Sequence, residues 1–390
     1  MPKSIKCVSI YTCEVDEPEA ALAELTQQLS EKITLAANTV GIIQCHPEFI
    51  TSGVLSHVAA NLPFDVAGTT TSSQSVNGLV NEMALTIFVI TADDISFYVG
   101  RTDCARSGIS KPLSAALENV EKNPNFIFTF PPLVIDYPGD DHVEAWGKEM
   151  PGVPVFGTMP VDDSIEFEDV RTIYRDEVYQ TSMVFVLCYG NIKPRFLIST
   201  LPEDSTLPYK GEITKSEGNL VYEIDNGNAI EYMKNMGFVD EDTSLSVYWF
   251  VPFLIDQKER PDYDGVPILR GFAVISEDGK AGRFRGKVDQ GSVFTMLNMT
   301  NEGVLIASGK KAEEISQMTD VNGVIGFSCI VRRMALMNTD SCDELTLVSE
   351  KLGDIPFMMC YAGGEICPTS VNNNVAINRY HSFSLIFLVL

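Results

Sequence analysis

The stretch FDVAGTTTSS at residues 64–73 is the first guide to the fold, because it has the pattern of a buried strand that ends in a glycine and a run of hydroxyl side chains. A second stretch, VPVFGTMPVDD at residues 153–163, has the same form and also follows a predicted helix. In layered α/β proteins, loops at the carboxyl ends of strands commonly bind ligands. A tight turn that only glycine adopts without strain is the simpler explanation. The pair predicts a weak internal repeat and marks Gly68, Thr69 and Gly157 as candidate ligand-binding residues.

Around these stretches, strand and helix patterns alternate through the first half of the chain. KCVSIYT (6–12) has a strand pattern, and residues 18–37 carry apolar side chains at helical spacing. Two longer segments, 84–102 and 179–200, each contain two alternating apolar runs separated by turn residues, which predicts a β-hairpin in each. The first half is therefore expected to be a layered α/β domain.

The segment LPEDSTLPYKGEITKSEGNL (201–220) is rich in Pro, Gly and charge, as is typical of a domain boundary. We place the domains at 1–205 and 206–390. Strand patterns dominate the second part, including one that continues into a helix over 322–336. The predicted fold class is α/β followed by α+β, with a largely antiparallel sheet in the second domain.

Composition restricts the partners. Hydrophobic residues make up 45% of the 390, and 28 Lys+Arg against 53 Asp+Glu give a net charge of −25. That charge repels phosphate backbones and anionic lipids, so neither nucleic acid nor a membrane is an expected partner. No secretory signal and no apolar run of about 20 residues is present. Nine cysteines at irregular spacing, without a CxxC pair, predict reduced thiols in a cytoplasmic protein.

Several catalytic motifs are missing. The sequence has no GxxxxGK[ST], no GxGxxG after a strand, no HExxH and no GxSxG. The neighbours Cys45 and His46 would point to opposite faces of a strand and make a poor chelate. Kinase, metal hydrolase and serine hydrolase activities therefore lose support, and no metal site is predicted.

Two clusters of residues in the last quarter of the chain have side chains suited to catalysis or ligand binding. Cys329 precedes Arg332 by three residues, so both can share one helical face, where a guanidinium favours the thiolate. A buried structural cysteine is the simpler explanation. Further on, Tyr361 leads through two glycines to Glu365, a pattern that suits a bulge bringing the backbone close to a ligand. A twisted strand with a solvated or arginine-paired glutamate is the alternative.

A third group, from Asn378 to His381, leads into the last apolar strand. Its histidine either orients a loop or acts as a ligand. We predict that Arg332, Glu365 and His381 converge on one cleft, and that Arg332 and Glu365 pair with each other or with a ligand, because an isolated buried charge is costly.

Together these groups resemble the FIST family of sensory ligand-binding proteins. The similarity lies in FSCIVRRMAL (327–336), CYAGGEICP (360–368) and NRYHSFSLIF (378–387), with weaker likeness at VDQGSVFTMLNM (288–299) and at the two Gly-Thr strand ends. The order and spacing of these motifs over about residues 36–390 carry the resemblance. Thr158, Met159 and Pro160 depart from the small residues that the family has after the second Gly-Thr strand.

The resemblance implies a sensory module that binds a small molecule, usually proposed to be an amino acid or a derivative. Signalling would pass through a partner such as a histidine kinase, a cyclic-dinucleotide enzyme or a chemotaxis component. Some members are described as haem-binding nitric-oxide sensors; His57 and His381 are the candidate haem ligands here.

The leading hypothesis puts the ligand in a cleft between the two domains. Arg332 would bind a carboxylate and Glu365 an amine, with backbone N–H groups of the two Gly-Thr ends beside them. Two alternatives remain open: an enzyme with Cys329 as nucleophile and His381 as base, and an interaction scaffold that docks a partner on an acidic face.

Overall fold

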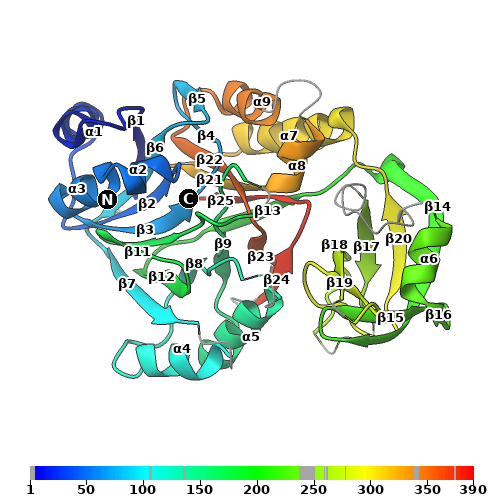
Figure 1. Cartoon of the computed structure of the whole chain (residues 1–390). Helices are drawn as coiled ribbons and strands as arrows, with labels where there is room; N and C mark the ends of the chain where they lie inside the picture. Colours follow the sequence, from blue (N-terminus) through cyan, green and yellow to red (C-terminus); the bar gives the residue numbers. More distant parts are fainter. Residues whose placement is uncertain are drawn as a thin grey trace.

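A computed structural model describes residues 5–390 apart from 105–107, 135–137, 165, 237–250, 259, 261, 277, 337–341, 373 and 374. The described residues form a body of three six-stranded sheets, labelled A, B and C below, and a β-barrel that lies beside it (Figure 1).

Sheet A comes from the first half of the chain. Across the sheet, the strands are β1 (Lys6–Thr12), β6 (Leu85–Ala92), β2 (Asn38–Cys45), β3 (Asp65–Thr70), β10 (Thr172–Tyr174) and β11 (Glu177–Tyr179). Strands β2 and β3 are parallel, and every other neighbouring pair is antiparallel. β6 is buried along its whole length, which explains its continuous apolar and hydroxyl sequence.

Sheets B and C each combine strands from both halves of the chain. Sheet B contains, in order, β13 (Arg195–Ser199), β25 (Leu385–Val389), β21 (Val324–Cys329), β22 (Phe357–Ala362), β4 (Gln74–Val76) and β5 (Leu79–Asn81). Sheet C contains β24 (Val375–His381), β23 (Glu365–Asn372), β9 (Val155–Thr158), β8 (Phe126–Phe130), β12 (Ser182–Gly190) and β7 (Ile95–Asp103). The body is thus one structure to which both ends of the chain contribute.

The three sheets repeat one topology. In each, four strands lie in the spatial order first, fourth, second, third, and the second and third are parallel. We call these sets repeat 1 (β1, β2, β3, β6), repeat 2 (β7, β8, β9, β12) and repeat 3 (β13, β21, β22, β25). The weak repeat seen in the sequence is therefore a threefold structural repeat.

Each repeat sends a hairpin to another repeat after its third strand. β4–β5 pairs with β22, β10–β11 with β3, and β23–β24 with β9, so the exchange is cyclic. The third strands are held at equivalent points by three backbone hydrogen bonds: Thr70 N–H to Arg171 O (2.9 Å), Met159 N–H to Gly364 O (3.1 Å) and Tyr361 N–H to Ser73 O (3.2 Å). The carboxyl ends of the third strands consequently meet at the centre of the body.

Both predicted Gly-Thr strand ends occupy the same place in their repeats. Gly68 pairs with Ile43, and Gly157 pairs with Thr129. In both cases an added β-carbon would overlap the carbonyl oxygen of the paired residue, and neither glycine has a positive φ. Close approach of the parallel strands requires these glycines; the explanation from a strained turn is wrong.

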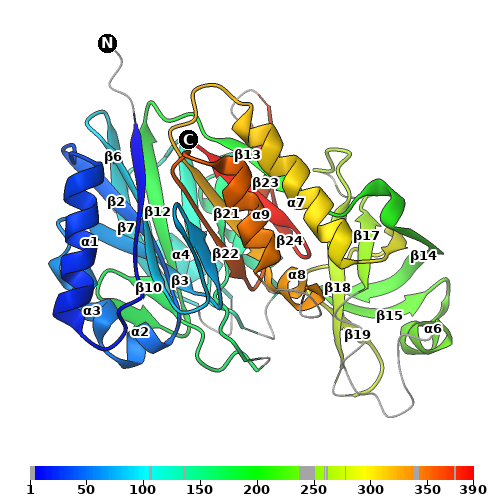
Figure 2. The same ribbon diagram turned by 90° about the horizontal axis from the view of Figure 1, so that it is seen from above.

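Helices cover the outer faces of the sheets, and the inner faces meet in one core that draws on all three, with Phe88, Phe128 and Phe327 among its members. Figure 2 shows α7 and α9 side by side over β21 and β22. Over sheet A lie α1 (Pro18–Lys32), α2 (Glu48–Thr51) and α3 (Val54–Asn61); over sheet C, α4 (Ser110–Ala116) and α5 (Asp140–Glu149); over sheet B, α7 (Asn301–Ser316), α8 (Ile330–Ala335) and α9 (Asp343–Leu352).

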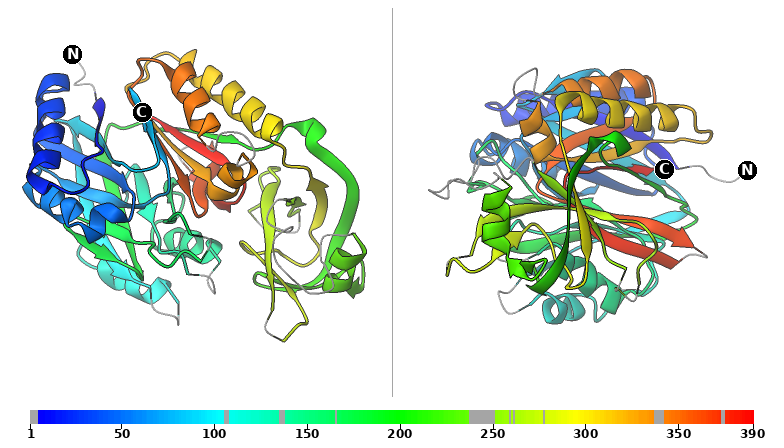
Figure 3. Two further views of the ribbon diagram at one scale, coloured as in Figure 1. Left: turned by 45° about the horizontal axis from the view of Figure 1, so that its top comes forward. Right: turned by 90° about the vertical axis from the view of Figure 1, so that its right-hand side faces the viewer.

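A six-stranded antiparallel barrel is inserted in repeat 3, between β13 and α7 (Figure 3). Its strands in order are β14 (Thr206–Glu217), β20 (Val293–Leu297), β17 (Pro252–Asp256), β18 (Ile268–Ile275), β19 (Gly282–Phe284) and β15 (Leu220–Ile224), with β14–β15 pairing closing the ring. The short elements η1 (Glu203–Ser205), β16 (Gly227–Asn228) and α6 (Ala229–Asn235) complete it. Phe253 and Phe294 fill its separate core.

Both hairpins predicted in the first half are wrong. β6 pairs with β1 and β2 in sheet A, whereas β7 pairs with β12 in sheet C. Likewise β12 lies in sheet C and β13 in sheet B. The physical reason is the repeat: each two-strand segment carries the chain from the last strand of one repeat to the first strand of the next.

The mixed α/β class is confirmed, with several mixed sheets and the barrel, and the strand-to-helix change at β21–α8 is as expected. The division at residue 205 stays a prediction. All nine cysteines are free thiols. None of the described helices is long and apolar enough to cross a membrane.

Candidate functional site

A cavity of about 40 Å³ lies between the barrel and the body. The barrel supplies Gly271, Phe272, Ala273 and Arg285; the body supplies Leu133, Phe167, Cys329, Ile330, Val331, Gly363, Gly364, Tyr380, Ser382 and Phe383. Its lining is largely apolar, and the space is enough for a few water molecules. The sequence predicted a cleft between domains 1–205 and 206–390. Only Leu133 and Phe167 of this cavity's lining belong to the first of those domains, so the cavity lies mainly within the second.

The turn from β22 to β23 forms one wall and needs both of its glycines. Gly364 has a φ of +146°, and an added β-carbon there would overlap the Tyr380 hydroxyl. At Gly363 the β-carbon would lie 2.8 Å from the Pro160 carbonyl oxygen. The ring of Tyr380 also contacts the backbone of Gly139 too closely for a side chain there. Gly139 and Gly364 therefore leave the space in which the Tyr380 ring lies as a wall of the cavity.

Glu365 follows this turn as the first residue of β23 and is completely buried. Neither of its carboxyl oxygens has a hydrogen-bond partner of normal geometry among the residues that the structure describes. Burial raises the pKa of the carboxyl well above its usual range. The backbone of Ser384, the charge of Arg332 and the Cys329 thiol only partly oppose that shift, because neither Ser384 nor Cys329 makes a hydrogen bond of normal geometry to the carboxyl. The carboxyl lies beside the Cys329 thiol, whose pKa is raised by burial and then by Glu365 itself. A buried carboxyl without a partner is an uncommon feature in a folded protein and suggests a binding group.

Arg332 does not pair with Glu365, so this part of the prediction is wrong. Its fully buried guanidinium donates to Glu344 Oε1 through Nε (3.0 Å) and Nη2 (2.8 Å), and to the Ser308 hydroxyl (2.7 Å). Nη1 donates to the carbonyl of Phe383 (3.1 Å). Arg332, on α8, thus links α7, α9 and the turn between β24 and β25. Its hydrogen bonds go to groups of the protein itself.

The third predicted member of the cleft, His381, is near but does not line it. It pairs with Glu365 across β23 and β24, and its Nε2 lies 3.1 Å from the Cys367 carbonyl oxygen. Burial lowers the pKa of His381 to about 4, so the ring is neutral. With Cys329 protonated and His381 bound elsewhere, the arrangement does not favour the cysteine-nucleophile alternative.

The remaining predicted residues have structural contacts. Tyr361 packs in the outer core under α9, on the face away from the cavity. Asn378 is half-buried and bonds β9, accepting from Val155 N–H (2.9 Å) and donating to Val153 O (2.8 Å). Thr69 donates to Gln44 (2.7 Å). Like Thr69, the glycines at 68 and 157 lie on their strands and do not line the cavity, although Gly157 pairs with Ile366, next to Glu365.

Protein-family models match most of the chain. The FIST N domain model matches residues 39–227, and the FIST C domain model matches residues 229–368. The chain belongs to the FIST family. No curated protein matches it. Among solved structures, a protein described as a cyanuric acid hydrolase that arose by structural concatenation is 9% identical, over 76% of this chain and all of that one, with a TM-score of 0.23. At that score the likeness supports no conclusion.

Sequence reasoning missed part of this FIST protein's cavity. Tyr380 lies inside the motif NRYHSFSLIF, but its sequence context does not mark it as a cavity residue, and the Gly363–Gly364 pair indicates only a bulge. Phe383, whose ring packs on Gly271 of the barrel, has a φ of +60° that nothing in its residue type signals. Arg285 and the rest of the barrel wall come from a region without a motif, so only the fold brings them here.

Haem does not fit the described site. His381, one of the two candidate ligands, already contacts the Cys367 carbonyl and has no place in the cavity wall, and the other, His57, is on α3. Within the described residues, no group of three or more His, Cys, Asp or Glu side chains is arranged to hold a metal.

Proposed function

We propose that this FIST protein is a sensor that binds a small amino-acid-like molecule between the barrel and the body. The single observation that carries the proposal is Glu365, which is fully buried next to the cavity-lining residues Cys329 and Gly364. Neither of its carboxyl oxygens has a hydrogen bond of normal geometry within the described residues. Leaving such a group without hydrogen bonds costs free energy that a suitable ligand recovers.

A primary ammonium is the chemistry that suits Glu365 best. In the ligand-free protein the raised pKa favours the neutral acid, which reduces the cost of burial. An ammonium group placed beside it favours the ionised carboxylate and supplies N–H donors to both oxygens. Ligand binding and ionisation of Glu365 are then coupled.

Arg285 is our candidate for the carboxylate end of the ligand, in place of Arg332. It lines the cavity from the barrel side and is half-buried. A guanidinium donates two parallel hydrogen bonds to a carboxylate. A zwitterion between Glu365 and Arg285 would contact both the body and the barrel, so its binding would alter how the two parts associate.

The signal would pass to a separate protein. A histidine kinase, a cyclic-dinucleotide enzyme or a chemotaxis component remains the proposed partner. The nine free cysteines suit a reducing compartment, and we place the protein in the cytoplasm on that basis.

Thermal unfolding in the presence of each of the natural L-amino acids tests the proposal. A ligand that binds only the folded state stabilises it by mass action, by about 2.7 kcal/mol at a hundred times Kd. At least one amino acid should raise the Tm of the wild type, and Glu365→Gln should lose that shift. Glu313→Gln is the matched control, because Glu313 pairs with Lys351 on the surface, away from the cavity. No shift with any amino acid, or a full shift in Glu365→Gln, would refute the proposal.

A further inference from the structure

Both chain connections between the barrel and the body lie on one side of the barrel. The chain enters it after β13 and leaves it before α7, and the two connections are adjacent, since Asn298 N–H donates to Ser205 O (2.8 Å). An apolar cluster that includes Leu201, Leu297 and Met299 lies here and continues to Phe383 in the cavity wall. Two adjacent connections flanked by apolar packing have the form of a hinge.

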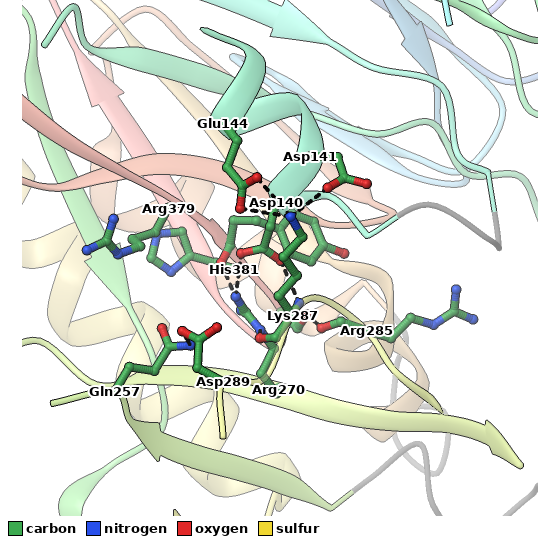
Figure 4. A network of polar contacts seen from close by, with 12 residues as sticks. Asp140, Asp141, Glu144, Gln257, Arg270, Arg285, Lys287, Asp289, Arg379 and His381 are labelled. Atoms are coloured by element: carbon green, nitrogen blue, oxygen red, sulfur yellow. Dashed lines mark hydrogen bonds and ion pairs between the residues drawn. The ribbon is translucent and has the colours of Figure 1, made fainter. Parts of the chain in front are cut away.

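Charged groups also join the barrel to the body (Figure 4). In addition to the residues described next, Asp262 on the barrel accepts from Arg379 Nη1 (2.8 Å). Arg270 on β18 is completely buried, and its Nη2 donates to Asp140 Oδ1 on α5 (2.9 Å). The second oxygen of Asp140 accepts from Lys287 N–H (2.7 Å). The Lys287 ammonium lies 2.7 Å from Asp141 and 2.8 Å from Glu144, both also on α5. We call Arg270, Asp140, Lys287, Asp141 and Glu144 the latch.

A latch made of charges opens more easily than an apolar interface of similar size. When the pair separates, the arginine and the carboxylate both regain water, which offsets much of the attraction that is lost. Opening an apolar contact exposes apolar surface to water, which is unfavourable, and no gain in hydration offsets that cost. The closed and open arrangements can therefore be close in free energy.

The latch is directly connected to the cavity. Arg270 Nη1 donates to the carbonyl of Tyr380 (2.8 Å), whose ring is a cavity wall. The next three residues on β18, at 271–273, cover the cavity from the barrel side. Movement of Arg270 away from Asp140 would carry this cover with it and uncover Cys329.

We infer that the barrel is a hinged cover for the cavity, held closed by the latch through its Asp140–Arg270 ion pair, and that ligand entry requires the latch to open. The inference rests on the proposed function in taking this cavity as the ligand site. It also explains why a cavity of about 40 Å³ can serve a ligand larger than a few waters.

Gly286 provides a selective way to disturb the latch. It has a φ of +97°, and an added β-carbon would lie 2.6 Å from Arg270 Nε and 2.9 Å from Asp140 Oδ2. Gly265, in the same barrel, has a φ of +85° and nothing within 4 Å of the added atom. Gly286→Ala and Gly265→Ala thus impose similar backbone strain, but only the first disturbs the ion pair.

The rate of alkylation of Cys329 by iodoacetamide in the ligand-free protein, followed by peptide mass mapping, measures opening. Cys188, fully buried in β12, reports unfolding of the body in the same sample. Because a buried ion pair is strongly weakened when its geometry is lost, Gly286→Ala should raise the Cys329 rate by at least about tenfold over Gly265→Ala. The Cys188 rate should be equal in both.

Equal Cys329 rates in the two variants would overturn the inference, and so would a parallel rise at Cys188, because it would report unfolding. Asp140→Asn, which removes the charge without steric overlap, should act in the same direction as Gly286→Ala. The measurement contains no ligand, so its result stands whether or not an amino acid binds. Failure of the thermal-shift test alone would therefore leave the hinge intact.

Discussion

Two buried glutamates lie on opposite faces of sheet B at the end of β21, and they differ in their hydrogen-bond partners. On one face, Glu344 accepts hydrogen bonds from Arg332, Ser308 (2.5 Å) and Ser328 (2.8 Å). On the other face, next to Cys329, Glu365 has no partner of normal geometry in the described structure. Both side chains are fully buried.

The difference shows that burial alone does not identify a functional carboxylate. Ser328 and Cys329 are neighbours on one strand, so they point to opposite faces. A charge that is fully paired inside the protein holds helices together, as Glu344 holds Arg332 to α7 and α9. A carboxyl that is equally buried but unpaired is available for a molecule from outside.

The largest effect should come from Glu344→Ala. It leaves the Arg332 guanidinium buried without a counter-charge, which costs about 3–5 kcal/mol. Urea denaturation of the variant and the wild type measures the free energy of unfolding. Glu313→Ala, which removes an exposed pair, should cost about 1 kcal/mol or less. Equal losses in the two variants would contradict the structural role of Glu344.

Removing both charges should cost less than removing one. Arg332→Met with Glu344→Leu replaces the ion pair by apolar side chains, which is often nearly neutral at buried sites. In the same urea titration, the double variant should be more stable than Glu344→Ala. Losses that add over the two positions would show that Arg332 and Glu344 are not coupled.

The opposite result is expected at Glu365. The substitution Glu365→Gln should not destabilise the ligand-free protein above about pH 5. The folded-state pKa is raised, so the native carboxyl keeps its proton where the unfolded chain, with a pKa of about 4.3, has lost it. Wild-type stability from this group is full below the unfolded pKa and falls as the pH rises towards the folded one. Glu365→Gln lacks that fall.

The free energies of unfolding of wild type and Glu365→Gln, measured at about pH 5 and about pH 8, should therefore diverge with rising pH in favour of the variant. Glu313→Gln should run parallel to the wild type. A constant difference between Glu365→Gln and wild type would mean that the buried carboxyl is not the titrating group.

The smallest effect belongs to His381, whose pKa of about 4 is lowered by burial. The unfolded histidine titrates near pH 6.5, so its contribution to stability is full above that value and is lost as the pH falls towards 4. His381→Gln should flatten this part of the stability profile and leave stability at about pH 8 little changed. His142, with the same lowered pKa, provides a comparison on α5. If His381→Gln lost stability at acid pH as steeply as the wild type, His381 would not be neutral in the folded protein.

Local pattern was informative about elements but not about their partners. Alternating apolar residues correctly predicted β6, β7, β12 and β13 as strands, yet β6 pairs with β1, which lies far earlier in the chain. An apolar strand pattern is satisfied by any neighbouring strand that buries it. The repeat was visible only where the close approach of parallel strands required a glycine, at Gly68 and Gly157.

The same distinction between local pattern and tertiary contact applies to the candidate site. The Gly-Gly-Glu pattern at 363–365 indicated a close backbone approach and a nearby carboxyl, and the structure has both. The partner of Arg332 could not be inferred, because several acidic residues follow it and the packing of α9 against α7 selects Glu344. The barrel wall has no motif because apolar side chains and glycines are ordinary residues until another surface contacts them.

The amino-acid sequence by itself determined the mixed α/β class, the FIST membership and the strand-end glycines, because these depend on short-range periodicity and on backbone space that only glycine permits. Tertiary structure alone decided the cyclic exchange of hairpins, the closure of the barrel and the contrast between Glu344 and Glu365. Those features depend on which distant segments meet. A carboxylate becomes a paired structural group or an unpaired binding group only when the fold determines what lies within hydrogen-bond distance of it.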